Sequence, residues 1–553
     1  AMADDLEDSI LRKAYEVVIC FQTILLKWFC RYNIGINAIN TLLTVLHFYC
    51  SILNQFSPIL AAISFIFPKS FRSLQNILHV NRNCFIKFVV CPKCHSTYNL
   101  DNISVENVCT YCEYPQHPHQ ARRKPCGSQL VARIKLKDGS LRVYPHKLYC
   151  YKSLAESLRL QFSRPGVLLA CEKWRQRTIP SNGLHDIYDG RVWKEFMQVN
   201  NTPFLAVPNN LGLMLNVDWF NPYKHSPYSV GAIYLVILNL PRSMRFKKEN
   251  IILVGLIPGP HEPSLHINTY LDPLVEKLKI LWKDGIEIKS PDAHTHITLR
   301  AALLCVACDT PATRKVCGFY GHIAKCGCSK CTKKFETNPD NGAMCYGGDF
   351  NTVSAPRKEE DHRAQAFLGL QQVSNAAKQR VESMSGSRFT ALMHLEYFNC
   401  VRFHIIDAMH NLFLGTAKHV MKNIWLNEDF PIIPKNHHTI LQSKVDKCAF
   451  PSSLGRIPHK IASGFSSFTA DQWKMWTMTL SMYVLDGELE QTHLNCWHLF
   501  VQACEKLVSP MLTIEAAEQS HDLLVQFCIG FERLYRIKKV TPNIHMHTHL
   551  VQC

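Results

Sequence analysis

Several features that would assign a protein to a common class are missing from this sequence. The first residues include Asp4, Asp5, Glu7 and Asp8 where a secretory signal would be basic, so we predict no secretory signal. No internal repeat is present. Acidic residues are scarce, because 44 Asp and Glu stand against 61 Lys and Arg and leave a net charge of +17. This excess suits either a polyanion such as DNA or a merely basic soluble protein.

Charged residues are also missing from one long segment. Residues 32–68 contain no Asp, Glu, Lys or Arg. A charge-free stretch of this length is long enough to cross a bilayer. Its apolar run is interrupted, however, by Asn33, Asn37, His47 and Pro58. We therefore interpret the segment as a buried pair of helices and expect no membrane partner.

Cysteine, in contrast, is abundant, with 24 residues in a chain of 553. Cys91-x-x-Cys94 and Cys109-x-x-Cys112 are two pairs with fourteen residues between them. Tight turns at two such pairs can point four thiolates at one ion, so the pattern predicts a structural Zn²⁺ knuckle rather than a disulfide framework. Cys126 competes with Cys112 for the fourth ligand position.

A second group of soft ligands follows the hydrophobic centre of the chain. His322, Cys326, Cys328 and Cys331 lie within ten residues of one another. They could bind zinc, share it with a distant His or Cys, or form a reduced, buried thiol cluster. We predict no catalytic cysteine, because neither a glycine-rich oxyanion turn nor a partnered base is evident.

Three histidines near the end of the sequence alternate along the chain. They are His545, His547 and His549, and this spacing predicts one side of a strand. That side could ligate a metal ion or face DNA.

Four hydrophobic runs predict β-strands, and an amphipathic pattern at 270–281 predicts a helix between the third and the fourth. The runs are residues 211–217, 231–240, 251–257 and 297–308. Periodicity leaves the last run ambiguous. We interpret it as a parallel strand that returns after the crossover helix.

An aspartate stands where the first and the last of these strands end. Asp218 closes the first run and Asp309 closes the fourth. Either acid alone is more often a simple cap. Together, carboxylates on neighbouring strand ends can hold Mg²⁺ or Mn²⁺ ions that activate water for attack on a phosphodiester. The order of elements therefore predicts an α/β protein with an RNase H-like mixed sheet core.

Two weaker patterns bear on the same chemistry. Asp407 and His410 are three residues apart on a predicted helix, so both can face a metal ion or a scissile phosphate. An N-cap aspartate beside a buried histidine explains the pair equally well. The basic run Arg122-Arg123-Lys124 can contact DNA phosphates.

The chain divides by composition into seven regions. We expect an N-terminal helical region at 1–85, a zinc-knuckle region at 86–130 and a mixed connecting region at 131–204. The catalytic core with its Cys-rich motif occupies 205–340, and a polar linker follows at 341–395. A large helical insertion covers 396–540, and a returning core strand begins at 541–553.

Eight stretches of the chain resemble the transposases of CACTA-type (En/Spm-like) DNA transposons. They begin at Cys91 (CPKCHSTY), Arg123 (RKPCG), Asp218 (DWFNP), Ile257 (IPGP), Leu281 (LWKDG), Asp309 (DTPA), Gly327 (GCSKC) and Asp407 (DAMHNLFLG). The resemblance implies a DDE/D nuclease that acts on DNA, with Asp218 and Asp309 as the first two catalytic acids. It also implies that Asp407 and His410 are the Asp-x-x-His element of a helical insertion.

In the family pattern the third acid is a glutamate beyond this insertion. The sequence stops before that segment, so we expect a truncated chain whose cleavage activity is absent or impaired. The alternative is a non-catalytic DNA- or protein-binding remnant of a transposase. Nuclear residence would follow from a DNA substrate, and a homo-oligomer is possible.

Overall fold

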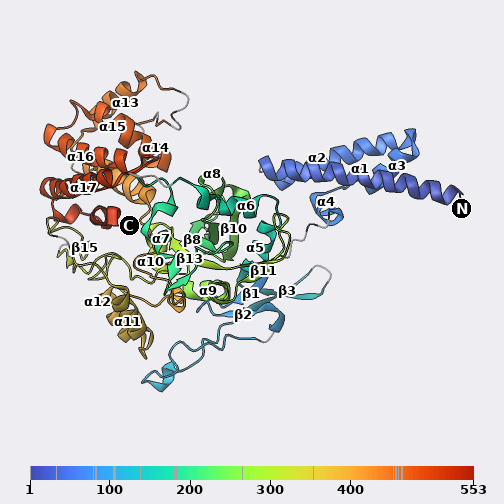
Figure 1. Cartoon of the computed structure of the whole chain (residues 1–553), viewed down its shortest axis with the longest axis horizontal. Helices are drawn as coiled ribbons and strands as arrows, with labels where there is room; N and C mark the ends of the chain where they lie inside the picture. Colours follow the sequence, from blue (N-terminus) through green and yellow to red (C-terminus); the bar gives the residue numbers. More distant parts are fainter. Residues whose placement is uncertain are drawn as a thin grey trace. The chain divides into compact units, whose positions relative to one another are not determined.

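The computed structural model describes most of the chain. The residues outside the description are 1, 33, 79, 81–83, 104–106, 137–138, 179–182, 264–265, 340, 353, 430, 452–453, 455–456, 459, 462–464 and 553. The chain separates into two compact units, Ala1–Phe85 and Ile86–Cys553 (Figure 1).

The first unit is helical. Its helices are α1 (Met2–Tyr32), α2 (Ile36–Leu53), α3 (Pro58–Ile66) and α4 (Phe71–Ile77), with a short turn η1 (Asn54–Phe56) after α2. A small core joins them, formed by Leu25, Ile39, Leu43, Phe67, Phe71 and Leu74. Ser57 and Ser70 cap α3 and α4 through their hydroxyl groups, as expected for residues that precede a helix.

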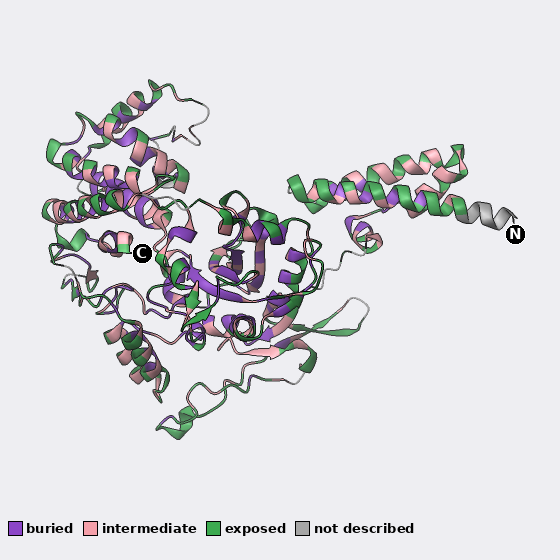
Figure 2. Ribbon diagram, viewed as in Figure 1, coloured by how far each residue is buried: buried purple, intermediate pink, exposed green. Residues whose placement is uncertain are grey.

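The charge-free segment forms helices as predicted, but most of its surface is exposed rather than buried. In α2 only Ile39 and Leu43 are buried (Figure 2). The stretch Ile36–Phe56 is long and apolar enough to cross a membrane, judged by length and composition alone. A single stretch of this kind is weak evidence.

A seven-stranded mixed sheet organises the second unit. Its strand order is β13-β8-β9-β10-β5-β1-β2, and every neighbouring pair is antiparallel except β13 with β8. The strands in that order are Ala301–Val306, Leu211–Phe220, Val230–Ile237, Ile251–Ile257, Leu148–Tyr151, Ile86–Val90 and Thr97–Asn99. The three predicted strands at 211–257 are therefore present.

The fourth predicted strand is split in two. Residues Ile297–Leu299 form β12, which pairs with β11 (Ile286–Ile288), and only then does β13 enter the sheet. The parallel pairing of β13 with β8 agrees with the prediction of a strand that returns after a helix. That helix, α9 (Ile267–Lys283), ends before Gly285, whose φ of 77° is accessible mainly to glycine.

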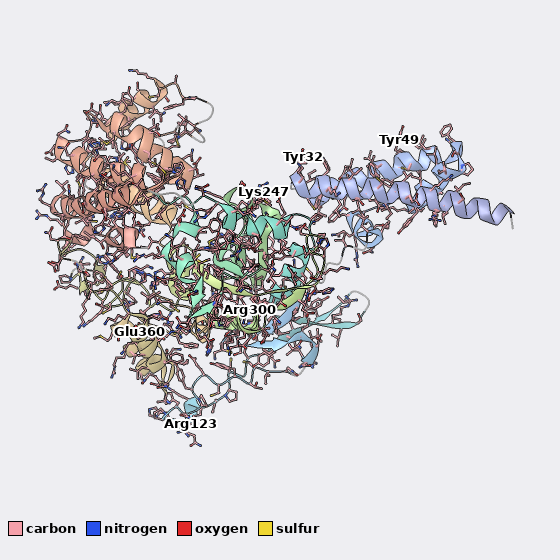
Figure 3. The ribbon with its side chains drawn as sticks, in the orientation of Figure 1. Tyr32, Tyr49, Arg123, Lys247, Arg300 and Glu360 are labelled. Carbon is pink, nitrogen blue, oxygen red and sulfur yellow. The ribbon has the colours of Figure 1, made fainter. Side chains whose placement is uncertain are left out.

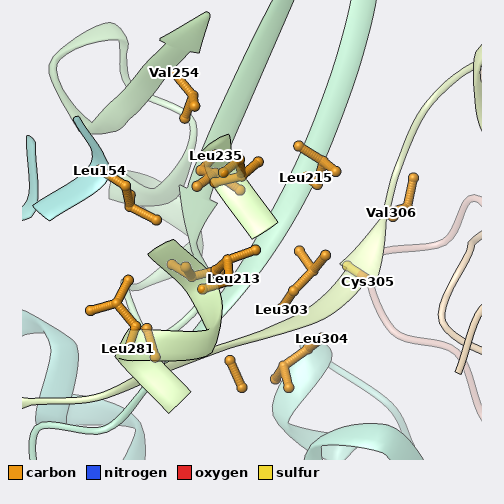
Figure 4. Packing of buried hydrophobic residues seen from close by; sticks show 14 of the residues in the cluster. Leu154, Leu213, Leu215, Leu235, Val254, Leu281, Leu303, Leu304, Cys305 and Val306 are labelled. Carbon is orange, nitrogen blue, oxygen red and sulfur yellow. The ribbon is translucent and has the colours of Figure 1, made fainter. Parts of the chain in front are cut away.

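The core of this unit lies on the sheet. Leu213 and Leu215 of β8, Leu235 of β9 and Leu303 of β13 are fully buried and pack near Leu281 of α9 (Figure 4). Burying several leucines of this size contributes on the order of 2 kcal/mol each before entropy is counted. The ends of β8 and β13 are therefore held in fixed positions.

The short elements around the sheet complete this region. The hairpin strands are β3 (Val131–Lys135) with β4 (Leu141–Pro145), β6 (Gln198–Val199) with β7 (Thr202–Pro203), and β14 (Glu336–Thr337) with β15 (Met344–Cys345). The helices are α5 (Leu154–Phe162), α6 (Val167–Glu172), α7 (Arg191–Glu195), α8 (Arg242–Arg245) and α10 (Thr310–Val316).

The predicted knuckle region is joined to the sheet. Its strands β1 and β2 extend the sheet beyond β5, with Val89 pairing with both Tyr98 and Leu148. A hydrogen bond from Lys152 N–H to Val254 O reinforces the β5–β10 border. Residues 86–130 are therefore part of the same compact unit as the core rather than a body of their own.

A second hydrophobic core lies in the C-terminal helices, which occupy most of the predicted helical insertion. These elements are η8 (Met409–Ala417), η9 (Val420–Trp425), α13 (His438–Asp446), α14 (Ala470–Met475), η13 (Trp476–Leu480), α15 (Ser481–Leu485), α16 (Gln491–Leu507) and α17 (Ile514–Tyr535). Trp425, Trp473, Trp476 and Trp497 are almost fully buried among them.

Two expectations about the second half are wrong. Residues 341–395 are not a polar linker, because they contain β15, α11 (Glu359–Leu370) and α12 (Asn375–Ser385). Residues 541–553 do not begin a strand, because α18 (Pro542–Met546) and η15 (His547–Gln552) occupy them up to 552. Thr541 caps α18 through its hydroxyl and Pro542 stands at its first turn, both favourable at a helix start.

Candidate metal centres and paired-aspartate edge

The two aspartates from the first and last core strands lie at one edge of the sheet. The parallel register pairs Leu215 of β8 with Val306 of β13. Asp218 follows Leu215 by three residues within β8. Asp309 follows Val306 by three residues, beyond the end of β13, and caps α10. Hydrogen bonds beyond this pair hold the strand ends together, from Ala307 N–H to Leu215 O and from Val217 N–H to the Cys308 sulfur. The two aspartates therefore lie side by side on neighbouring chain segments, at the same distance beyond the last paired residues of β8 and β13.

A third segment runs parallel beside β13 at this edge. Val306 forms a parallel bridge with His404, and its N–H and C=O bond with Phe403 and Ile405. Asp407 again follows three residues after the bridge. On each of the three adjacent segments, an aspartate therefore follows the paired residue by three positions. This brings Asp407 to the edge of the sheet that carries Asp218 and Asp309.

Asp407 forms an ion pair with His410 at the start of η8. The Asp407 carboxylate accepts hydrogen bonds from the His410 ring and from Met409 N–H. The bond with Asp407 raises the pKa of His410, burial opposes it, and the charges of Asp309 and Asp218 raise it further. His410 therefore lies close enough to both strand-end aspartates to respond to their charge.

Both strand-end aspartates also make the local contacts expected of caps. Asp218 is exposed and accepts from Trp219 N–H. Asp309 is half-buried, precedes α10 and accepts from Ala312 N–H. One carboxylate oxygen of each has a backbone donor, and the carboxylate remains able to bind an ion. Among the described residues, this edge holds no set of three ligands as close as those of the two thiol clusters below.

The first thiol cluster consists of Cys91, Cys94, Cys109 and Cys126. Their sulfur atoms all lie within 4.8 Å of one another. The Cys94–Cys109 and Cys91–Cys126 sulfur distances are 3.3 and 3.7 Å. Two thiolates on a tetrahedral zinc ion would be about 3.8 Å apart, so the donor set fits zinc. Cys112 lies outside the group, and Cys126 is the fourth member.

The electrostatics of this cluster favour a thiolate at Cys91, whereas burial raises the pKa of Cys94 to about 12 and also raises that of Cys126. Burial acts to raise the pKa of Cys91, but hydrogen bonds from the backbone at Cys94 and Lys93 lower it to about 7. His95, at φ 60°, closes the turn and hydrogen-bonds the Tyr270 hydroxyl on α9 at 2.7 Å. The turn that forms the cluster is thus attached to the core helix.

The second cluster combines two pairs from distant parts of the chain. Cys328 and Cys331 meet His545 and His549, all four are buried, and their ligand atoms lie within 4.8 Å of one another. Two cysteines and two histidines are a common structural zinc set. Burial acts to raise the pKa of Cys328, but hydrogen bonds with Cys331, His545 and His549 lower it well below its ordinary value.

Helical spacing explains which histidines take part. Residues four apart share one face of a helix, so His545 and His549 point together, whereas His547 points away. His547 instead hydrogen-bonds the Thr416 hydroxyl at 3.0 Å. The sequence signal that would have found this pair is the i, i+4 spacing, which we missed by treating the segment as a strand.

The other two members of the predicted second group do not join it. Cys326 contacts the carbonyl of Thr332, and the His322 carbonyl accepts a hydrogen bond from Tyr346. One of the alternatives for this group was an ion shared with a distant His or Cys, and the geometry agrees with it for Cys328 and Cys331 only.

The basic run is exposed. Arg122, Arg123 and Lys124 lie on the surface of a long excursion between Cys112 and Cys126. Figure 3 shows Arg123 on this excursion. Its guanidinium donates to the carbonyl of His117 at 2.6 Å, which orders this part of the excursion. The run is placed to meet a polyanion without any rearrangement of the core.

The fold and these sites define a mixed α/β protein with an aspartate edge and two cysteine-containing clusters that could hold zinc. Residues 182–383 match the model of the transposase family tnp2. The matched residues contain Asp218, Asp309, Cys328 and Cys331. The match supports a transposase-like protein and implies DNA as a partner. No curated protein matches the chain.

Proposed function

We propose that this chain is a transposase-like protein of the CACTA type that acts on DNA through an RNase H-like core. The observation that carries the proposal is that Asp218 and Asp309 each follow by three residues the paired Leu215 and Val306 of the neighbouring parallel strands β8 and β13. The order β10-β9-β8-β13, with α9 before β13, supports the RNase H-like assignment. Because a fold alone does not define a function, the two carboxylates are what support metal-dependent cleavage.

The residues at this edge suit metal-dependent phosphodiester cleavage. When bound, Mg²⁺ would supply an activated water and charge neutralisation at the phosphate. Asp218 and Asp309 would hold the ion. The hydrogen bond with Asp407 raises the pKa of His410 and so favours its protonated form. A protonated imidazole there can stabilise negative charge on the phosphate or give a proton to the leaving oxygen.

A second candidate function is DNA binding without cleavage. It is favoured because, among the described residues, no third ligand forms a compact set with Asp218 and Asp309, and the nearby Asp407 is already paired with His410. The exposed basic run would then contribute phosphate contacts whose strength falls steeply with salt. Cleavage assays separate the two functions.

The first test is nicking of DNA by the full chain in Mg²⁺ or Mn²⁺. Replacing Asp218 or Asp309 with Asn should lower the nicking rate by about a thousandfold, because each change removes a metal ligand. Asp361→Asn, an exposed change on α11, should leave the rate unaltered. Equal nicking by wild type and both edge variants would reject the metal assignment, and no nicking by wild type would favour DNA binding alone.

A second test measures the pKa of His410 by NMR titration of its ring signals. Because Asp218 and Asp309 both raise this pKa, saturating Mg²⁺ should lower it by neutralising their charge. Asp407→Asn should lower it more, since the hydrogen bond with Asp407 is the largest influence. A His410 pKa unaffected by Mg²⁺ would mean that the ion does not bind at this edge.

The raised pKa of His410 also determines the direction in which protein stability depends on pH. His410 holds its proton more tightly in the folded protein than in the unfolded chain. Its contribution to stability is therefore complete below the ordinary histidine pKa and is lost as pH rises through the folded-state value. Any catalytic role of the imidazolium should decline in the same direction.

A further inference from the structure

One hairpin of the second unit is exposed on both of its faces. Strands β3 and β4 pair only with each other and form a separate two-stranded sheet (Figure 1). Opposite residues of an antiparallel pair share one face, so Arg133 lies with Val143 on one side and Ile134 with Arg142 on the other. All four residues are exposed, and Figure 2 shows the same for most of the hairpin.

The root of the hairpin is anchored at the first thiol cluster. Leu130 and Val131 are no more than 7% exposed and belong to one small hydrophobic core with Cys91 and Cys109. The N–H of His146 donates to the carbonyl of Leu130 at 3.1 Å and joins the two strands at this end. A fixed root therefore supports a ribbon whose two faces are open to a partner.

The two strands of the hairpin are basic. They contain Arg133, Lys135 and Arg142 and no Asp or Glu. The register places Arg133 and Lys135 on one face and Arg142 on the other, and all three are exposed. A partner that matches this pattern has to present negative charge to both faces of the ribbon at once.

Apolar side chains stand beside these cations. Leu141 is opposite Lys135 on the first face, and Ile134 is opposite Arg142 on the second. Leu141 and Ile134 are 66% and 48% exposed. A groove of duplex DNA suits this mixture, because it has phosphates along both walls and base edges, including the methyl groups of thymine, between them.

The dimensions of the ribbon select the major groove. A β-ribbon with its side chains is about 10 Å thick, judged by the spacing of packed sheets. The major groove is about 12 Å wide and the minor groove about 6 Å, so only the major groove admits the ribbon. A flat anionic surface such as a bilayer would meet one face alone and leave the cations of the other face in water.

We propose that the β3–β4 hairpin inserts into the major groove of duplex DNA. Arg133 and Lys135 contact the phosphates of one wall, and Arg142 contacts those of the other. The inference rests on the proposed function in taking DNA as the partner. It uses no residue of the aspartate edge, so binding through the hairpin can be measured without cleavage.

The test is the affinity of the full chain for a duplex of random sequence, measured by fluorescence anisotropy over a range of salt concentrations without added Mg²⁺. Arg133→Ala with Lys135→Ala should reduce the slope of log affinity against log salt by about 1.8, and Arg142→Ala should reduce it by about 0.9. The reason is that each cation displaces counterions from one phosphate. Binding to single-stranded DNA, which has no groove, should keep its slope in both variants.

Two controls separate a contact from a general loss of charge. Lys247→Ala with Lys248→Ala removes two exposed cations from the segment before β10 and should leave the slope unaltered. Arg142→Lys keeps the charge and should also keep the slope. Circular dichroism of every variant should match that of wild type, because all of these positions are exposed.

The outcomes distinguish this inference from the proposed function. A full chain that does not bind duplex DNA would overturn both. Duplex binding whose salt slope is the same in wild type and in the hairpin variants would overturn the inference alone. So would a slope that responds to the change on one face and not to Arg142→Ala, or hairpin variants that lose binding to anionic phospholipid vesicles and retain full binding to the duplex.

Discussion

Replacing Cys328 or Cys331 with Ser should remove one zinc ion per chain and lower the free energy of unfolding by about 5 kcal/mol. Zinc held by four protein ligands is coupled to folding, because the unfolded chain has no assembled site. Here Cys331 and His545 are 214 residues apart, so the ion would close a very long loop. Metal content by mass spectrometry and thermal unfolding by circular dichroism measure the two effects.

The chain offers two close controls. Cys326→Ser changes a cysteine in the same short motif, and His547→Gln changes a histidine between two ligands, yet neither residue belongs to the cluster. Both variants should keep the zinc content of wild type. Loss of zinc from the Cys326 variant and not from the Cys328 variant would contradict the assigned ligands.

The knuckle should behave as an independent site. Cys91→Ser should remove a different zinc ion, and Cys112→Ser should remove none, because Cys126 is the fourth member of that cluster. Combining Cys91→Ser with Cys331→Ser should abolish zinc binding. Two clusters with separate ligands predict additive losses of metal.

The central strands β8, β9 and β10 were predictable from the sequence because most of their residues are buried. Runs such as Leu211–Val217 and Ile251–Ile257 are nearly continuous in apolar residues, and only a few strand orders can connect them. The same runs located Asp218 and Asp309. The bridge between Val306 and His404 aligns Asp407 with these two aspartates. Because it joins residues far apart in the sequence, no local sequence pattern predicts it.

The segment at the C-terminal end shows how a local pattern can mislead. Alternate histidines at 545, 547 and 549 have the period of a strand, whereas the capping Thr541 and Pro542 favour a helix. The helical signal determines the conformation, and it brings only two of the three histidines to the cysteines.

Residues 341–395 were missed because their overall composition is polar, although Ala366, Leu392 and Met393 are buried in the hydrophobic core. Buried polar contacts also hold the segment in place. Arg357 is buried and donates to the carbonyls of Cys326 and Cys328, and also to that of Ser385. His362 is buried against the Ser387 hydroxyl at 2.9 Å. A polar composition was therefore compatible with a fixed structure around the second cluster.

Gly386, in this same segment, should be the most sensitive single position outside the metal ligands. Its φ is 72°, a backbone conformation that residues other than glycine rarely adopt. A Cβ added at this position would lie 2.0 Å from the backbone oxygen of Cys326. Because that oxygen belongs to the backbone next to Cys328, the clash cannot be relieved by rotating a side chain. Gly386→Ala should therefore cost about 4 kcal/mol of stability.

Gly342→Ala provides the comparison within the predicted linker. Gly342 has φ 70°, and no atom lies within 4 Å of an added Cβ, so this change tests the backbone conformation without the clash. It should cost only about 1 kcal/mol. Urea unfolding of both variants measures the difference in their free energies of unfolding. The zinc content of Gly386→Ala shows whether a displacement of the backbone at Cys326 also disturbs the second cluster. Equal, small losses at both positions would mean that 341–395 is the loose connection its composition suggested, with no fixed contact to the cysteine segment.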